Sequence, residues 1–300
     1  MEKSVNYTSV TVIADTQHPI VPISRITTFQ VYAPRYLLAE VNTHGVLAKS
    51  AASSRAIPVS KRIGMVQKEP WVPDVFGKNR PGMQSVEDLN EAAQDEARQI
   101  WHQAIEDAIE HAEALRQTDV HKQYANRVLE PYVYYSGVLT ATEWDNFWWL
   151  RTNTDADPGF QVLAQKMKEA YDASVPKVSN YHLPYISKEE FEAIEDIDLL
   201  MKISAVRCAR VSYVSLETGK PTTVEEDFKL IEKLTKPTGA HLSPFDHPAK
   251  SDRFIVVGGN YHWRNPTHHG RFWGWIPHRY DLERQLGITS RRSSFDGFSF

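Results

Sequence analysis

The order of the secondary-structure patterns limits the fold of this chain more than any single motif does. Residues 5–14 and 26–33 carry short runs of β-branched and aromatic side chains, which predict two strands near the start. Most later segments show the apolar spacing of helices, and these segments do not alternate regularly with strands. The sequence therefore predicts an α+β fold rather than a doubly wound parallel sheet.

Helices are expected to make up most of the remaining chain. Ser85 and Asp88 form a capping-box pattern at the start of a long charged helix that ends near Arg116. The other expected elements are helices over 34–49, 121–130, 142–151, 159–173, 188–209 and 222–235 with Gly239 as terminator, a long loop over 58–82, a connector over 176–184, a strand over 253–257 and a frayed tail over 290–300.

Length and composition place the chain among globular proteins. Its 300 residues are 41% hydrophobic, and we expect a single domain over 1–300, with a subdivision into 1–175 and 185–300 as the alternative. No run approaches the roughly 20 consecutive apolar residues of a membrane span. The single cysteine cannot form an internal disulfide, which fits a reducing compartment. A cytoplasmic protein is therefore expected. The net charge of -4 argues against a nucleic-acid surface. Any bound phosphate is therefore expected to belong to a small molecule.

The run Ser53-Ser54-Arg55 offers the chemistry of an anion-binding turn. Arg55 presents a planar fork of donors that matches a phosphate, and each serine hydroxyl adds one donor without adding charge. Backbone N–H groups at a helix terminus nearby would complete such a cradle. The same three residues are also common on solvated loops, and the run alone does not decide between the two interpretations.

An aromatic helical stretch over 144–151 contains one asparagine, Asn146, and one arginine, Arg151. One interpretation is a core helix whose arginine pairs with a carboxylate. In the other, Arg151 lies at the mouth of an aromatic pocket, where it polarises a carbonyl or stabilises negative charge that develops on a ring.

Other reactive side chains give weaker signals. Cys208 invites a nucleophile hypothesis, but a lone cysteine among small apolar residues is more often buried filler. Asp246 and His247 are adjacent after a Ser-Pro turn, and adjacency alone does not make a catalytic dyad. Several histidines gather over 262–278 without a second cysteine or a His-Glu-x-x-His pattern, so no metal site is predicted.

Taken together, these segments resemble the flavin-dependent thymidylate synthase family. The resemblance is to its virus-encoded branch, whose members carry a Thr-His-Arg and Ser-Ser-Arg-Ala-Ile-Pro signature near the start. Here the matching runs are Thr43-His44-Gly45 and Ser53-Ser54-Arg55-Ala56-Ile57-Pro58. The resemblance reaches most of the chain and implies helices packed on an antiparallel or mixed sheet, in the fold of thymidylate synthase complementing proteins.

The resemblance also implies roles for individual residues. Ser53 and Arg55, with Ser54 and Glu40 beside them, match the region that binds the phosphate and the rest of deoxyuridine monophosphate (dUMP), and Arg127 resembles a second nucleotide-contacting arginine. Arg151 matches the arginine that grips the pyrimidine and helps to activate it, so it is the catalytic candidate. The candidates for cofactor binding are His44, Asn146, Ser212, Asp246 and His247.

The chain also departs from the family. The segments around Ser212 and Asp246 follow the phosphate motif here, whereas in the cellular enzymes they precede it. Gly45, Ala48 and Ser50 stand where the signature has Arg, Ser and Asn, at positions that serve mostly flavin binding. Loss of a guanidinium beside a pyrophosphate removes about 1.5 to 3 kcal/mol. The nucleotide-phosphate half of the site is therefore expected to be more complete than the flavin half.

The resemblance implies a C5 methyltransferase that converts dUMP to dTMP. Its cofactors would be FAD, NADPH and 5,10-methylenetetrahydrofolate, and its assembly a homotetramer that binds nucleotide and folate but no nucleic acid or membrane. One alternative is a folate-dependent hydroxymethylase of dUMP or dCMP, which ends the reaction with water instead of hydride. The other is a catalytically silent relative that binds nucleotide as a sensor or assembly subunit. The departures at Gly45 and Ser50 motivate both alternatives.

Overall fold

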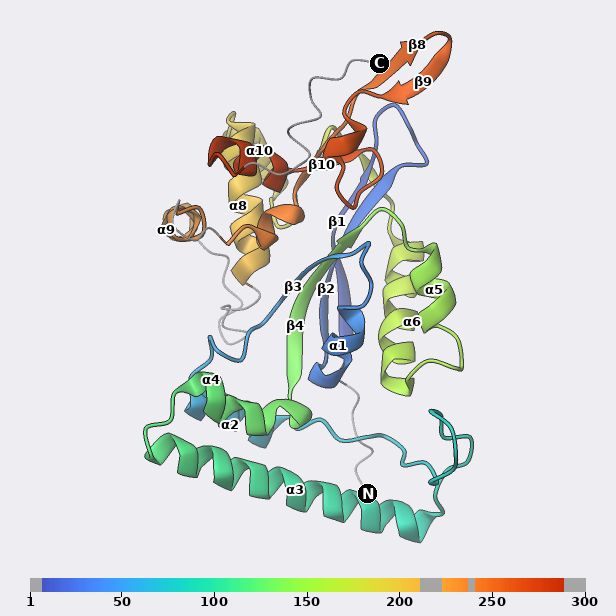
Figure 1. The fold of residues 1–300 in the computed structure, drawn as a ribbon, viewed down its shortest axis with the longest axis vertical. Coiled ribbons are helices and arrows are strands. Elements are labelled where there is room, and N and C mark those ends of the chain that lie inside the picture. Colours follow the sequence, from blue (N-terminus) through green and yellow to red (C-terminus); the bar gives the residue numbers. More distant parts are fainter. Residues whose placement is uncertain (1–6, 211–222, 237–240, 289–300) are drawn as a thin grey trace.

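The centre of the molecule is a mixed sheet of five strands in the order β3-β4-β2-β1-β5 (Figure 1). The computed structural model describes residues 7–210, 223–236 and 241–288. Strands β1 to β4 pair antiparallel with their neighbours, and β5 joins β1 in parallel. The strands are β1 (Ser9–Gln17), β2 (Arg25–Pro34), β3 (Ala48–Ala51), β4 (Tyr134–Ala141) and β5 (Lys177–Val178). The predicted α+β class is confirmed.

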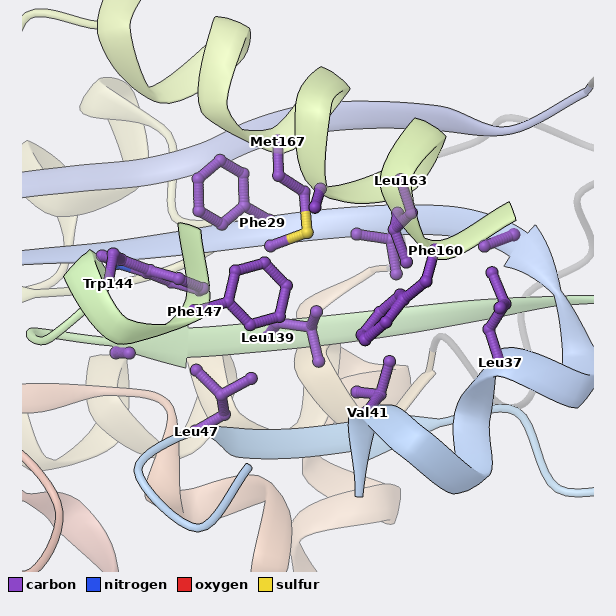
Figure 2. Packing of buried hydrophobic residues seen from close by; sticks show 14 of the residues in the cluster. Phe29, Leu37, Val41, Leu47, Leu139, Trp144, Phe147, Phe160, Leu163 and Met167 are labelled. Atoms are coloured by element: carbon purple, nitrogen blue, oxygen red, sulfur yellow. The ribbon is translucent and has the colours of Figure 1, made fainter. Parts of the chain in front are cut away.

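Two helices cover one face of this sheet and enclose the main core (Figure 1). They are α5 (Asp145–Arg151) and α6 (Pro158–Ala173). The side chain of Asp157 caps α6 by accepting a hydrogen bond from the N–H of Phe160. Phe147 and Phe160 point from the helices toward Phe29 and Leu139 of the sheet (Figure 2). Burying one such aromatic side chain contributes about 1.5 to 3 kcal/mol.

A second layer of helices lies beyond one end of the strands (Figure 1). Its long helix begins after Asn90, whose side chain accepts a hydrogen bond from the N–H of Ala93. The expected stripe of Trp101, Ile105 and Ile109 packs into a cluster with the neighbouring helices. The layer consists of α2 (Val59–Lys68), α3 (Glu91–Gln117), α4 (Lys122–Ala125) and the 3-10 helix η2 (Asn126–Tyr132).

The C-terminal part of the chain packs on the other face of the sheet (Figure 1). It contains a three-stranded sheet in the order β10-β7-β6 and a hairpin of β8 and β9. The strands are β6 (Tyr181–His182), β7 (Ala249–Ser251), β8 (Phe254–Val257), β9 (Asn260–Trp263) and β10 (Trp275–Pro277). The helices are α7 (Lys188–Ala193), α8 (Ile197–Arg210), α9 (Val224–Leu234) and α10 (His278–Gln285), with 3-10 helices η3 (Ser243–Asp246) and η4 (Pro266–His268).

Several sequence-based expectations for the elements are wrong. The predicted helix over 34–49 shrinks to the 3-10 helix η1 (Arg35–Leu37) and α1 (Leu38–Val41), because residues 48–51 pair with β4 instead. The predicted loop over 58–82 contains α2. The helix predicted over 188–209 is two helices, and the connector over 176–184 contains β5 and β6. Gly239 and the tail over 290–300 lie outside the described residues.

The second face of the sheet carries buried polar side chains. Thr16, Thr28 and Thr140 project from β1, β2 and β4 toward His182 and His247 of the C-terminal part, and five hydrogen bonds of 2.7 to 2.9 Å link these groups to one another and to β3. Both imidazoles are fully buried, and burial lowers the pKa of each to about 3. Both histidines are therefore neutral in the folded protein at ordinary pH.

We predict that the free energy of unfolding falls as the pH drops from 7 to 5. Below pH 6.5 the unfolded chain protonates each histidine, whereas the folded chain does not do so until about pH 3, so stability is complete above pH 6.5 and is lost below it. The loss at pH 5 is about 2 kcal/mol for each of the two histidines. Urea denaturation at the two pH values measures it. His182→Gln should reduce the loss and His111→Ala, at an exposed position, should not; an unchanged loss in His182→Gln would contradict the prediction.

Candidate active site

Arg151 lies at the last position of α5 and joins two of the other predicted residues. Its Nε donates to Nε2 of His44 over 2.9 Å, and its Nη1 donates to Oε2 of Glu40 over 2.6 Å. The guanidinium carbon lies 4.5 Å from the centroid of the Phe160 ring. Within the described parts of the chain, Nη2 of Arg151 makes no hydrogen bond to protein. The aromatic core thus holds an arginine with one donor group still available.

His44 is a neutral hydrogen-bond acceptor in this arrangement. Its ring is 7% exposed and packs edge-on against Phe147, with 5.0 Å between the ring centroids. Burial, with help from the charges of Arg151 and Lys49, lowers the pKa of His44 to about 4. Because Nε2 accepts from Arg151, the imidazole proton is on Nδ1. The ring therefore holds the guanidinium in one orientation and, because it is uncharged, does not repel it.

The Ser53-Ser54-Arg55 turn follows β3 and is held by a buried asparagine. Nδ2 of Asn126 donates to the carbonyl oxygens of Ser54 and Ile57, each over 2.8 Å. Ser54 is buried, whereas Arg55 is exposed and has no carboxylate partner among the described residues. The backbone N–H of Arg55 donates to Oγ of Ser53 over 3.3 Å. The turn is therefore rigid at its base and presents a guanidinium to solvent.

Three further arginines surround this turn. Arg62 of α2 is 2% exposed, and burial followed by the nearby charge of Arg35 lowers its pKa to about 10. Nη2 of Arg62 lies 3.5 Å from Oγ of Ser54, and its Nε has no hydrogen-bond partner. Arg35 and Arg127 share the carboxylate of Glu130, at 3.3 and 2.8 Å. One carboxylate thus faces three guanidinium groups in addition to Arg55, which leaves a positive surplus at the turn.

Glu130 is the acidic member of this group and remains ionised. Burial opposes its charge, but a hydrogen bond from Ser54 and the charges of Arg35 and Arg127 hold the pKa of the carboxyl below its usual value. Sequence reasoning identified Ser54 and Arg127 here but missed Arg35, Arg62 and Glu130. Arg62 stands four residues after Pro58, in a segment read as a loop. Recognising α2 would have placed its side chain toward the turn.

The two groups of residues are separate hydrogen-bonded clusters. The first joins Glu40, His44 and Arg151 before β3, and the second surrounds the turn after β3. No hydrogen bond or ion pair between the two clusters occurs in the part of the chain that the structure describes. β3 is an edge strand of the sheet, so its outer side is not covered by another strand. The strand connects both clusters, and η3 and α8 pack beside it.

The cofactor candidates lie in three different settings. Asn146 is exposed on α5, on the same side as Trp149 and Leu150. Asp246 is half-buried and accepts a hydrogen bond from Nη1 of Arg279 over 3.2 Å; burial raises the pKa of its carboxyl despite that pairing. His247 is fully buried and uses both ring nitrogens within the protein. Ser212 lies outside the described residues.

A cavity of about 300 Å³ opens beside Asp246. Ala48 of β3 forms one wall, and Arg271 and Arg279 bring positive charge to the other. Nη1 of Arg271 donates to the carbonyl oxygen of Leu47 over 3.2 Å. The remaining lining residues are His268, Gly270, Phe272, Pro277, Tyr280 and Glu283. The cavity therefore lies on the face of β3 toward the C-terminal part.

Cys208 is a core residue, as the filler interpretation predicted. Its side chain is completely buried in α8, and burial raises the pKa of the thiol. The structure gives no hydrogen-bond acceptor that would activate it as a nucleophile within the described residues. No three metal-ligating side chains come together in that part of the chain, and none of its helices is long and apolar enough to cross a membrane.

The model of the thymidylate synthase complementing protein family matches residues 13–177. The chain belongs to this family. The matched stretch is more than half of the chain and contains both clusters, from Glu40 to Arg151. Asp246 and His247 lie beyond it, so the family match does not extend to the rearranged segments. No curated protein sequence matches the chain.

Two solved structures of nucleotide-binding proteins are similar to this family member. One is a UMP/dUMP methylase, PolB from Streptomyces cacaoi, bound with 5-Br UMP; it is 16% identical with a TM-score of 0.48, and the match covers 56% of this chain and 89% of that chain. The other is thymidylate synthase X from Helicobacter pylori with FAD and dUMP, 19% identical with a TM-score of 0.33, covering 49% and 67%. Because both TM-scores lie below 0.5, we draw no conclusion about the site from either structure.

We predict that Arg151→Ala raises the pKa of His44 from about 4 toward the usual value for histidine, because the positive charge of Arg151 is the largest cause of the low pKa after burial. Lys49→Met should raise it less, since Lys49 contributes less. Titration of the His44 ring by NMR measures both shifts. A pKa that is the same in Arg151→Ala and in the unmodified protein would show that the two side chains are not in contact.

Proposed function

We propose that the protein is a C5 methyltransferase of pyrimidine deoxynucleotides that converts dUMP to dTMP, with the whole chain acting as one cytoplasmic catalytic domain. The observation that carries the proposal is the Ser53-Ser54-Arg55 turn, where an unpaired Arg55 and a buried Arg62 leave positive charge in excess. The family match over both clusters supports it. We also assign the chain to the virus-encoded branch of the family, which its Ser53-Ser54-Arg55-Ala56-Ile57-Pro58 run resembles.

The phosphate is the part of the substrate that this turn fits. A nucleoside monophosphate carries up to two negative charges near neutral pH, and the turn supplies hydroxyl donors from Ser53 and the guanidinium of Arg55. Arg127 lies beside them through its bond to Glu130. Asn126 holds the turn in place before the ligand arrives, so little ordering entropy is lost on binding.

The base is assigned to the cluster around Arg151. The pyrimidine attacks the electrophile through C5, and the enolate-like form of the ring that does so carries negative charge on a carbonyl oxygen, which a fixed donor stabilises. Nη2 of Arg151 is such a donor, because His44 and Glu40 hold the rest of the guanidinium. The displaced C5 proton passes to solvent, and the proposal needs no cysteine nucleophile, since Cys208 is completely buried in α8. Arg151 is therefore the catalytic residue of the proposal.

One nucleotide must meet both clusters, either within one chain or across two. The position of β3 allows both, because this edge strand runs between the clusters and no described strand pairs with its outer side. In the proposed homotetramer, the turn of one subunit and Arg151 of another complete a site at this edge. Nucleotide and folate are then the small-molecule partners.

The residues fit a flavin only in part. Asn146 and the exposed ring of Trp149 offer a donor and a flat surface on α5, but Gly45 and Ala48 lack the guanidinium and hydroxyl that the signature has at these positions. A Cβ atom at Gly45 would have open space around it, so nothing in the packing excludes a larger residue there. When bound, FAD reduced by NADPH would supply hydride to the carbon delivered by 5,10-methylenetetrahydrofolate.

The second candidate function is a hydroxymethylase of dUMP or dCMP, and the missing flavin-binding groups at Gly45 and Ala48 favour it. The two functions differ in the product formed from methylenetetrahydrofolate. Purified protein is incubated with dUMP or dCMP and this folate, with and without NADPH and FAD, and the product mass is measured. A methyl product that requires NADPH supports the methyltransferase, and a hydroxymethyl product without NADPH supports the alternative. Binding of nucleotide with no product in any mixture supports the silent relative.

We predict that Arg55→Ala weakens dUMP binding by about 2 kcal/mol, because a charge-assisted phosphate contact is lost. Arg98→Ala, at a half-buried arginine on α3 outside both clusters, serves as the matched control and should bind like the unmodified protein. Isothermal titration calorimetry measures both variants. Equal affinity of Arg55→Ala and the control would remove Arg55 from the site.

Arg151→Ala should lower kcat more than it weakens dUMP binding, because its proposed contact strengthens as charge develops on the ring. Arg151→Lys keeps the charge but loses the paired donors to His44 and Glu40, and we expect it to restore binding better than turnover. Steady-state kinetics alongside calorimetry separates the two effects. Equal losses in binding and turnover would make Arg151 a binding residue only.

A further inference from the structure

A continuous chain of hydrogen bonds crosses the central sheet from β3 to β1. Oγ of Ser50 lies 2.9 Å from Nε2 of His247, whose Nδ1 lies 2.8 Å from Oγ1 of Thr140. Thr140 and Thr28 are 2.7 Å apart between their hydroxyl oxygens. Thr28 continues to Nε2 of His182 over 2.7 Å, and Nδ1 of His182 meets Oγ1 of Thr16 over 2.8 Å. Six side chains from four strands and two C-terminal segments thus form one path.

The register of the sheet builds this path. Thr28 and Thr140 are directly opposite each other on β2 and β4, and Ala48 faces Thr140 from β3. Because side chains alternate along a strand, Ala48 and Ser50 point to the same face as the two threonines. The C-terminal part then inserts one histidine on each side of the threonine pair.

The path can pass on the direction in which its hydrogen bonds donate, but it carries no net charge. Thr28, Thr140, His182 and His247 are fully buried, and both imidazoles are neutral. A neutral imidazole donates through one nitrogen and accepts through the other, and each hydroxyl donates only once. If every internal bond is satisfied and the hydroxyls of Thr28 and Thr140 each donate within the path, only two arrangements exist, in which all the donors point toward β1 or all point toward β3.

The two arrangements differ in whether the Ser50 hydroxyl can donate a hydrogen bond to a ligand. With the donors pointing toward β1, Ser50 donates to His247 and can only accept from another molecule. With the donors pointing toward β3, His247 donates to Ser50, and the Ser50 proton is available to another molecule. Reversal moves the proton of each imidazole to its other nitrogen and turns each hydroxyl, with no net gain or loss of protons.

Ser50 is the end of the path where a ligand can arrive. It is half-buried on the edge strand, three residues before the Ser53-Ser54-Arg55 turn, while Thr16 at the opposite end is 5% exposed. Ala48, on the same face of β3, lines the cavity beside Asp246. A ligand that reaches this face of β3 would meet the Ser50 hydroxyl.

We propose that His182 and His247 are positioning residues that set, through Thr28 and Thr140, whether Ser50 donates or accepts a hydrogen bond toward a bound pyrimidine nucleotide. This inference rests on the proposed function, because it takes the nucleotide as the ligand at β3. It gives His247 a part in the site although its own ring nitrogens are both used inside the protein. His182 acts from the β1 end of the path, without touching the ligand.

The test breaks the path at Thr28 and reads the effect at Ser50. Thr28→Val removes the linking hydroxyl at nearly constant volume, and Thr28→Ser keeps it. Thr27→Val is the matched control, because Thr27 is the neighbouring buried hydroxyl on β2 but bonds to Asp15 outside the path. Thr16→Val shortens the path at its far end and is the second variant if Thr28→Val does not fold. Calorimetry with dUMP gives the affinity of each protein.

We expect Thr28→Val and Ser50→Ala each to weaken dUMP binding by about three- to tenfold, as for loss of one oriented hydrogen bond. The double variant should bind no more weakly than Ser50→Ala alone, because both changes remove the same contact. Thr28→Ser and Thr27→Val should stay within about twofold of the unmodified protein, a margin near 0.4 kcal/mol. Additive losses in the double variant, or equal losses in Thr27→Val and Thr28→Val, would overturn the proposal.

A second readout does not depend on nucleotide binding. Nitrogen-15 NMR of the ligand-free protein reports which nitrogen of His182 and of His247 carries the proton. We expect the two rings to show the same sense, with the proton on Nδ1 of both or on Nε2 of both, and Thr28→Val to uncouple them. Opposite senses in the unmodified protein contradict the relay. If the senses agree but dUMP does not bind, the proposed function fails while the hydrogen-bond path stands.

Discussion

The pairing of β3 with β4 is the interaction on which the candidate site depends. This four-residue strand is the only regular element between His44 and the Ser53-Ser54-Arg55 turn in the described structure, and its register fixes both ends. Gly137 faces Ala51 in this register, and a Cβ atom at Gly137 would come within 2.9 Å of the Tyr135 ring and 3.4 Å of the carbonyl oxygen of Ser50. The Tyr135 ring packed at this point therefore favours glycine at position 137.

The two faces of β3 separate two kinds of chemistry. Toward α5 and α6, an aromatic core surrounds one guanidinium and keeps His44 uncharged beside it. Toward the C-terminal part, the sheet carries neutral hydroxyls and imidazoles that hold no net charge. Positive charge gathers where β3 ends, around Arg55 and Arg62, neither of which forms an ion pair with a carboxylate among the residues that the structure describes. A ligand with one anionic group and one polar ring matches that distribution.

The sequence predicted the parts of the fold whose pattern is local. The strands near 9–17 and 25–34, the helices at 145–151 and 158–173 and the stripe of α3 were all expected, with ends shifted by a few residues. β4 was missed because all eight of its residues are buried, so it shows no alternation of polar and apolar side chains. β3 was mistaken for helix because its stability comes from pairing with β4, which local preference does not record.

The sequence likewise predicted only part of the candidate site. Arg151 and His44 were selected by resemblance, and the structure joins them with Glu40 in one hydrogen-bonded cluster. Arg62 and Glu130 could not be selected, since they reach the turn only through the packing of α2 and η2. The buried path through Thr28 and His182 was equally invisible, because its members are separated by 154 positions and meet only across two sheets.

A crystal structure of the protein with dUMP decides most directly whether the two clusters form one site. The phosphate should lie within hydrogen-bonding distance of Ser53 and Arg55, and the pyrimidine ring of the same nucleotide should contact an Arg151 side chain, of the same subunit or of another. A nucleotide that binds at only one cluster, with no Arg151 of the assembly near its ring, would contradict the site proposed for this family member.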